Sequence, residues 1–128
     1  MMHADEGGLN RVSERIIGCA LVVANMLGQG FLEKVYENAL AVEIRSFGLA
    51  VKQPFGIVVK YRDTVVGQYF ADTLVENSII VELKATKSLD PFQSAQCRNY
   101  LKASGLRLCL LFNFGGPRVE VKRIVMNV

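Results

Sequence analysis

The sequence predicts one α/β domain with a mixed sheet, in which the elements follow the order two helices, three strands, one helix and two strands (ααβββαββ). Three observations predict this order. Apolar residues recur every three or four positions over residues 10–27, they alternate with polar ones over residues 50–85, and they run almost unbroken over residues 106–114. With 128 residues, 51% of them hydrophobic, the chain is long enough for one core and too short for two. We therefore expect a flexible N-terminus over residues 1–9 and a single domain over residues 10–128.

The first two helices are predicted from their apolar spacing and their glycines. The first begins at Asn10, a plausible N-cap, and ends before Gly28-Gln29-Gly30. The second runs from about Phe31 to Phe47, and Gly48 ends it. The first helix is apolar on so much of its circumference that it is either central to the core or shared with a second subunit. A homodimer is therefore one of two open interpretations.

Three strands are predicted next, as an antiparallel meander over residues 50–61, 65–75 and 79–85, in which Pro54 favours an edge or a bulge. A helix follows from Pro91 to about residue 103, capped by Ser88 or Asp90. The run over residues 106–114 is typical of a strand buried on both faces, and residues 118–126 alternate like an edge strand. The intervening helix allows a crossover that sets the strands before and after it parallel.

Three charged residues lie inside this apolar meander. Glu82 and Lys84 are one residue apart and share one face of a strand, while Asp72 lies on the strand before. A Glu-x-Lys pair alone is more commonly a solvated surface pair. Two carboxylates and an ammonium among apolar residues are costly to bury unless they hold a cation or each other. This combination is what metal-assisted phosphodiester cleavage needs, because carboxylate oxygens bind Mg²⁺ and an ammonium stabilises charge on phosphate or orients water.

A shared metal requires that Asp72 and Glu82 lie on the same face of the sheet. A two-residue turn at Asn77-Ser78 would pair Asp72 with Leu83, on the wrong face. We therefore predict an odd-length loop, such as Glu76-Asn77-Ser78, that pairs Asp72 with Glu82, or a bulge that restores this register.

Composition narrows the class of protein further. Residues 1–83 carry a net charge of −3, from seven Lys/Arg and ten Asp/Glu, and residues 84–128 carry +6, from eight and two, which weakly supports a basic face for a polyanion. Three cysteines without a Cys-x-x-Cys pair are typical of reduced thiols in a cytoplasmic protein. The longest uncharged apolar run, residues 16–24, is too short to cross a bilayer. His3 is the single histidine, so a zinc site is not expected.

The turn and first helical residues Gly30-Phe31-Leu32-Glu33-Lys34-Val35-Tyr36 resemble the signature of the GxxExxY proteins, a branch of the PD-(D/E)XK nuclease-like superfamily. Asp72, Glu82 and Lys84 stand at the superfamily's signature positions, with Ala71 in place of its Pro. The resemblance implies a restriction-endonuclease-like core, a Mg²⁺ (or Mn²⁺) cofactor held by Asp72 and Glu82, and Glu33 as a further acidic residue near the metal. Without the Asp72, Glu82 and Lys84 motif, Glu33 is better explained as a first-turn carboxylate favoured by the helix dipole.

Several other residues are candidates for binding substrate. In the family, the helix after the Glu-x-Lys strand carries Gln and Tyr-Leu at the positions of Gln96 and Tyr100-Leu101, which implies that Gln96 orients Lys84 or the phosphate. Tyr36 belongs to the same second tier, with a core aromatic as its alternative. Arg98 and Lys102, four residues apart, are candidate phosphate contacts or a solvated face.

The resulting hypothesis is a Mg²⁺-dependent nuclease acting on nucleic acid, with DNA favoured over RNA. Asp72, Glu82 and Glu33 would bind metal, and Lys84 would support the nucleophile or the transition state. The alternative is a non-catalytic nucleic-acid-binding or adaptor subunit that keeps the fold. No separate DNA-reading motif is visible, which favours a larger complex that supplies specificity.

Overall fold

The computed structural model describes residues 4–126 and contains three helices and seven strands in that range. Its order is α1 (Ala4–Leu27), α2 (Glu33–Ser46), β1 (Val51–Lys52), β2 (Phe55–Tyr61), β3 (Thr64–Ala71), β4 (Thr73–Val75), β5 (Ile79–Lys84), α3 (Pro91–Ser104), β6 (Leu108–Asn113) and β7 (Glu120–Val125). The mixed α+β class is as predicted. His3 and the rest of residues 1–3 lie outside the described residues.

Five strands form the main sheet, in the order β1-β4-β5-β6-β7. β5 and β6 are parallel and every other neighbouring pair is antiparallel. The crossover through α3 therefore sets β5 and β6 parallel, as predicted. β6 is buried along its whole length between two neighbours, and β7 lies at the edge, which confirms both expectations from the sequence.

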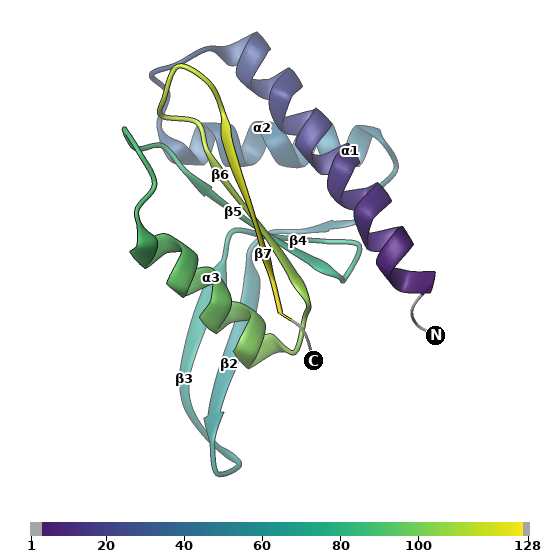
Figure 1. Ribbon diagram of the computed structural model, residues 1–128, viewed down its shortest axis with the longest axis vertical. Coiled ribbons are helices and arrows are strands. Elements are labelled where there is room, and N and C mark those ends of the chain that lie inside the picture. The colour runs from purple at the N-terminus through teal and green to yellow at the C-terminus, as the bar shows by residue number, and fades with distance from the viewer. Residues whose placement is uncertain (1–3, 127–128) are drawn as a thin grey trace.

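The predicted three-stranded meander is wrong in one respect, because two breaks divide it between two sheets. β2 and β3 form a separate two-stranded hairpin, while β1 and β4 belong to the main sheet. The first break falls at Gln53-Pro54, where proline cannot donate a ladder hydrogen bond. The second falls at Asp72, a bend between β3 and β4. In Figure 1 the β2–β3 hairpin extends away from the main sheet, below α3.

Helices cover both faces of the sheet (Figure 1). α1 and α2 pack on one face around the alternate residues Ile79, Val81 and Leu83 of β5, and the buried side of α1 contributes Ile16, Cys19, Ala20 and Val23 as predicted. α3 packs on the other face, where its Cys97, Tyr100 and Leu101 meet Ile80, Cys109 and Leu111. The base of the hairpin joins this second cluster through Ile57 and Ala71. Glu82 therefore emerges on the α3 side of the sheet.

The first helix begins earlier than predicted. Asn10 is not its N-cap, because α1 starts at Ala4. Leu9 packs against the core, and the Arg123 guanidinium donates to Asn10 Oδ1 at 3.1 Å and to Ser13 Oγ. Helical turns draw most of their stability from such tertiary contacts, which residue spacing does not reveal. The second helix is shorter than predicted, since it begins at Glu33 and ends at Ser46.

Candidate active site

The bend at Asp72 brings the two predicted carboxylates together. The β4–β5 ladder pairs Thr73 with Val81 and Val75 with Ile79, and the same register continued by one residue sets Asp72 opposite Glu82. Residues 76–78 form the odd-length loop that was predicted. Glu76 and Asn77 both have a φ of 53°, as the two central residues of a type I′ turn require, and Asn tolerates this conformation well.

Each carboxylate accepts a hydrogen bond from the backbone of the opposite strand. The Asp72 N–H donates to Glu82 Oε1 at 2.7 Å, and the Leu83 N–H donates to Asp72 Oδ2 at 2.8 Å. These reciprocal bonds stand where ladder hydrogen bonds would otherwise continue β4. They fix both side chains and leave Asp72 Oδ1 and Glu82 Oε2 without a hydrogen-bond partner among the described residues.

Burial makes this pair reluctant to ionise. Glu82 is only 4% exposed. Burial, then the nearby charge of Asp72, raises the pKa of Glu82 from 4.5 to about 8. Burial likewise raises the pKa of Asp72 from 3.8 to about 6, against the opposing effect of the Leu83 N–H. Two adjacent oxygen donors with such high proton affinity form a site where a cation would compete with protons.

Lys84 is the positively charged residue that acts on the pKa values of both carboxyl groups. It follows Glu82 on the same face of β5, and its charge lowers the pKa of both Glu82 and Asp72. Lys84 forms no direct ion pair with either carboxylate among the described residues. Its ammonium therefore acts across a gap and is not neutralised by contact, which is the arrangement expected of a group that stabilises charge on a bound phosphate.

α2 adds two acidic residues to the electrostatics of the site. Glu33 begins the helix, and its charge raises the pKa of both Asp72 and Glu82. Glu37, one turn later, is 4% exposed and acts more strongly than Glu33 on Asp72. Its Oε2 accepts from Gln53 Nε2 at 2.6 Å and pairs with Lys34 Nζ at 3.2 Å. Glu37 is not among the residues predicted from the sequence, although its four-residue spacing from Glu33 was the available signal.

Tyr36 holds the turn that precedes Glu33. Its hydroxyl donates to the Gly28 carbonyl at 2.5 Å and accepts from the Phe31 N–H at 3.3 Å, and its ring stacks on Phe114 at 4.7 Å between centroids. Gly28 and Gly30 have φ values of 72° and 103°, which side chains other than glycine rarely adopt. The glycines and the tyrosine of the sequence motif thus build the turn that positions Glu33, and Tyr36 is a positioning residue.

α3 brings some of the predicted substrate-binding residues to the site and not others. Tyr100 is 5% exposed, and its pKa is raised by burial and by the charges of Glu82 and Asp72, which places its hydroxyl in the field of the pair. Gln96 and Lys102 line a pocket beside Tyr100. Arg98 is exposed and does not line this pocket.

The N-terminus of α3 is capped by Asp90, whose side chain accepts from the Phe92 N–H at 2.8 Å, and Gln93 completes this capping box.

A buried amide that sequence reasoning missed holds the chain after Lys84. Asn113, at the end of β6, is fully buried, and its Oδ1 accepts from the N–H groups of Thr86 at 2.9 Å and Gly115 at 3.0 Å. Its Nδ2 donates to the Thr86 carbonyl and to Glu120 Oε1, each at 3.0 Å. All of its hydrogen-bonding capacity is therefore used, and two of the four bonds fix Thr86 in the segment that follows Lys84. An Asn inside an apolar strand was the signal.

The donor set fits a hard divalent cation. No three His, Cys, Asp or Glu side chains among the described residues converge into a group that could hold a metal. Mg²⁺ does not need such a group, since it is commonly bound by one or two carboxylates together with water and substrate phosphates. Asp72 and Glu82 supply two carboxylates. Glu33 does not join them as a third ligand in one cluster, so its predicted role in metal binding stays a prediction.

The comparisons with known proteins identify the family of the chain. Residues 10–124 match the PD-(D/E)XK nuclease superfamily, so the chain belongs to that superfamily. Nucleases of this superfamily generally use divalent metal ions. Among curated proteins, no significant match is found.

One solved structure, titled "Crystal structure of SSO0001", is similar with a TM-score of 0.56 and 15% sequence identity. The match covers 74% of this chain and 51% of that one, so the chain spans about half the length of that protein. At this identity the likeness shows the fold alone, and it supports the restriction-endonuclease-like core. Within the described residues, no helix has the length and apolar character to span a membrane.

Proposed function

We propose that this protein is a nuclease that hydrolyses phosphodiester bonds with a divalent metal ion, Mg²⁺ or Mn²⁺, held by Asp72 and Glu82. The observation that carries the proposal is the reciprocal pair of hydrogen bonds at 2.7 and 2.8 Å that sets Asp72 and the buried Glu82 side by side. When bound, the metal supplies Lewis-acid polarisation of the phosphate and a water of lowered pKa. Superfamily membership and the fold support this chemistry.

The residues of the chain have distinct parts in this proposal. Lys84 orients the attacking water or stabilises the charge that develops on the phosphate. Glu33 assists from α2, while Glu37, already engaged by Gln53 and Lys34, adds negative charge that favours a cation. Tyr100 lies at the edge of the pair and approaches the substrate from α3.

Five finer statements belong to the same proposal. The glycine and tyrosine geometry around Glu33 supports membership of the GxxExxY branch. DNA remains favoured over RNA, and a larger complex is expected to supply specificity. Cys19, Cys97 and Cys109 are buried and free, which supports a reducing, cytoplasmic setting. On α1, Leu21 and Met26 are 50% and 80% exposed, which supports a homodimer.

The test compares wild type with Lys84→Ala on labelled DNA and RNA, in Mg²⁺, Mn²⁺ or EDTA. Loss of the Lys84 ammonium should slow cleavage by about 10²–10³-fold with little change in binding, because the interaction is made mainly in the transition state. Lys87→Ala is the matched control, since Lys87 is an exposed lysine three residues further along. If wild type binds nucleic acid in a salt-dependent way but cleaves no substrate, the proposed function changes from a nuclease to a non-catalytic adaptor. Cleavage by Lys84→Ala at the wild-type rate would remove Lys84 from the chemistry.

A further inference from the structure

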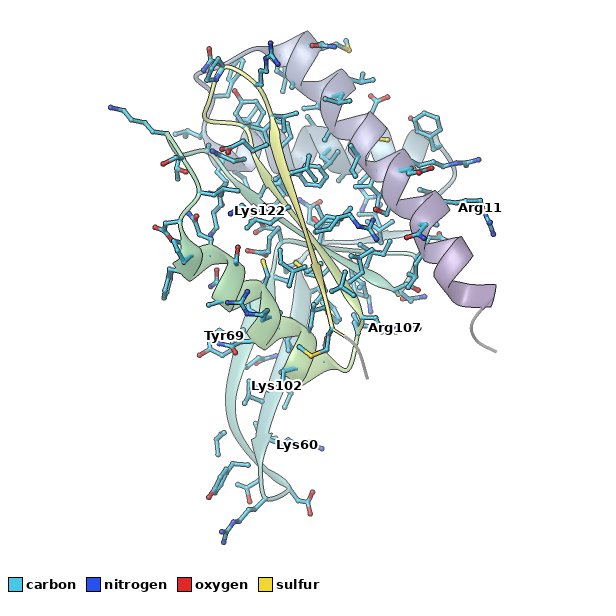
Figure 2. The ribbon with its side chains drawn as sticks, in the orientation of Figure 1. Arg11, Lys60, Tyr69, Lys102, Arg107 and Lys122 are labelled. Atoms are coloured by element: carbon cyan, nitrogen blue, oxygen red, sulfur yellow. The ribbon has the colours of Figure 1, made fainter. Side chains whose placement is uncertain are left out.

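A groove lies between α3 and the β2–β3 hairpin, on the same face of the sheet as Glu82. It encloses about 750 Å³, within the range typical of ligand sites. Its polar and aromatic lining consists of Lys60, Tyr69, Phe92, Gln96, Asn99, Tyr100 and Lys102, and we call it the α3 groove. Figure 2 shows Tyr69 and Lys102 beside α3, with Lys60 further along the hairpin.

The sequence places these side chains together by simple periodicities. Phe92, Gln96, Asn99 and Ala103 follow one another at steps of three and four, so they form a single stripe along α3. Tyr69 pairs with Ile57 across the hairpin, and Ile57 is buried in the cluster beneath α3. Cross-strand partners share a face, so Tyr69 is held on the side of the hairpin that faces this helix.

The chemistry of the lining matches unpaired nucleotides. Tyr69 and Phe92 are 54% and 74% exposed, so their ring faces are open to stack on a base. Gln96 and Asn99 offer amides for base edges, and Lys60 and Lys102 offer charge for phosphates. Of the described residues that line the groove, none is Asp or Glu. A lining of this kind excludes polycations and complements a polyanion that carries flat aromatic groups.

Tyr100 links the α3 groove to the acidic pair. This residue also lines the groove, and its ring centroid is 6.1 Å from that of Tyr69. The charges of Glu82 and Asp72 act on its hydroxyl. Tyr100 therefore belongs both to the lining of the groove and to the surroundings of the carboxylates, on the same face of the sheet.

We propose that the α3 groove binds a single-stranded segment of nucleic acid, with a base stacked on Tyr69, and leads the neighbouring phosphodiester to Asp72 and Glu82. This inference rests on the proposed nuclease function for its second half only. A duplex does not meet these requirements, because its bases stack on one another and cannot reach aromatic side chains. DNA and RNA share the recognised chemistry, namely unpaired bases on a phosphate backbone.

Binding in EDTA tests the groove without any cleavage. Fluorescent oligothymidine, oligouridine and a blunt duplex of equal length are titrated with wild type, Tyr69→Ala and Tyr69→Phe. The alanine variant should bind both single strands about 5- to 150-fold more weakly, as expected for one lost base–aromatic stack, and the phenylalanine variant should bind like wild type. Tyr61→Ala is the matched control, because Tyr61 is a 63% exposed tyrosine of the same hairpin that does not line the groove. The relative affinity for the two single strands shows which nucleic acid the groove prefers.

The outcomes separate the groove from the nuclease. Three outcomes would each overturn the proposed role of the groove. Tyr69→Ala could bind single strands as tightly as wild type does, it could lose equal affinity for single strand and duplex, or wild type could bind no single strand. If Tyr69→Ala cleaves duplex and single strand at wild-type rates, the nuclease proposal is retained and the role of the groove is rejected. Binding that depends on Tyr69, with no cleavage under any metal, would retain the groove and reject the nuclease. Melting temperatures of all variants identify any loss of fold.

Discussion

Glu82 couples the charge of the active site to the stability of the fold. In the unfolded chain its carboxyl group should titrate near its ordinary pKa of 4.5, whereas in the folded chain its pKa is about 8. Between these values the folded protein holds a proton that the unfolded chain has released. Stability is therefore greatest below the lower pKa and falls as the pH rises through the higher one, by at most about 1.4 kcal/mol per pH unit.

Urea unfolding in EDTA between pH 7 and pH 8 reports mainly on Glu82, because Asp72, with a pKa of about 6, is already largely ionised in this interval. The midpoint of wild type should fall steadily as the pH rises. Glu82→Gln keeps an oxygen that can accept from the Asp72 N–H and cannot ionise, so its midpoint should stay nearly constant. Equal pH dependence in the two proteins would show that Glu82 is ionised throughout this interval.

The individual residues differ in how far the sequence reveals them. Asp72, Glu82 and Lys84 could be predicted because charges inside an apolar hairpin are conspicuous. Glu37 and Asn113 could not be recognised as readily, since a helical Glu and a strand-end Asn are ordinary until their surroundings are known. Glu37 becomes part of the site through Gln53, which is 16 residues away, and Asn113 through Thr86, which is 27 away. Contacts at such separations depend on the whole topology.

At the scale of elements, the strands were predicted well where turn geometry decided the outcome. The odd-length loop over residues 76–78 follows from the requirement that two carboxylates share a face, and the capping box of α3 follows from Asp90-Pro91 and Gln93. The division of the meander at Asp72 could not be predicted in the same way. Residues 71–75 form a continuous extended run in sequence, whereas in the fold the base of the hairpin packs with α3 and β4 joins the main sheet.

The contact between the end of β6 and the segment after Lys84 leads to a prediction about Gly115. A Cβ added there would lie 2.1 Å from the Thr86 carbonyl oxygen and 2.4 Å from its nitrogen, both backbone atoms. Gly115→Ala should therefore displace the Thr86 backbone and cost about 1–3 kcal/mol of unfolding free energy. Because Thr86 follows Lys84 by two residues, cleavage should weaken as well.

Gly116→Ala is the control for this experiment. Its Cβ would lie 3.6 Å from the Arg118 carbonyl oxygen, an ordinary contact, so its stability should stay within about 0.5 kcal/mol of wild type. Urea unfolding of the three proteins measures the difference. Equal stability of the two variants would mean that the Thr86 backbone can move away from the added Cβ at little cost in free energy.

At the scale of the whole molecule, the domain is a five-stranded sheet covered on both faces, with Asp72 and the buried Glu82 side by side at one bend. Because of this arrangement, the stability of the fold should depend on the concentration of cations that bind there. Any ion that binds the folded chain and not the unfolded one raises stability in proportion to the logarithm of its concentration. The unfolded chain separates Asp72 from Glu82 by ten residues and offers no comparable site.

Millimolar Mg²⁺ or Mn²⁺ should therefore raise the melting temperature of the protein. At ten times the dissociation constant the gain is about 1.4 kcal/mol, or roughly 4–7 °C for a domain of this size. Asp72→Asn should abolish the shift, while its side-chain oxygen can still accept from the Leu83 N–H and preserve the bend. Asp63→Asn serves as the control, since Asp63 is an exposed carboxylate at the hairpin turn with a φ of 65°, which Asn also tolerates. Differential scanning fluorimetry of the three proteins decides the matter, and an equal metal response in wild type and Asp72→Asn would show that Asp72 is not a ligand.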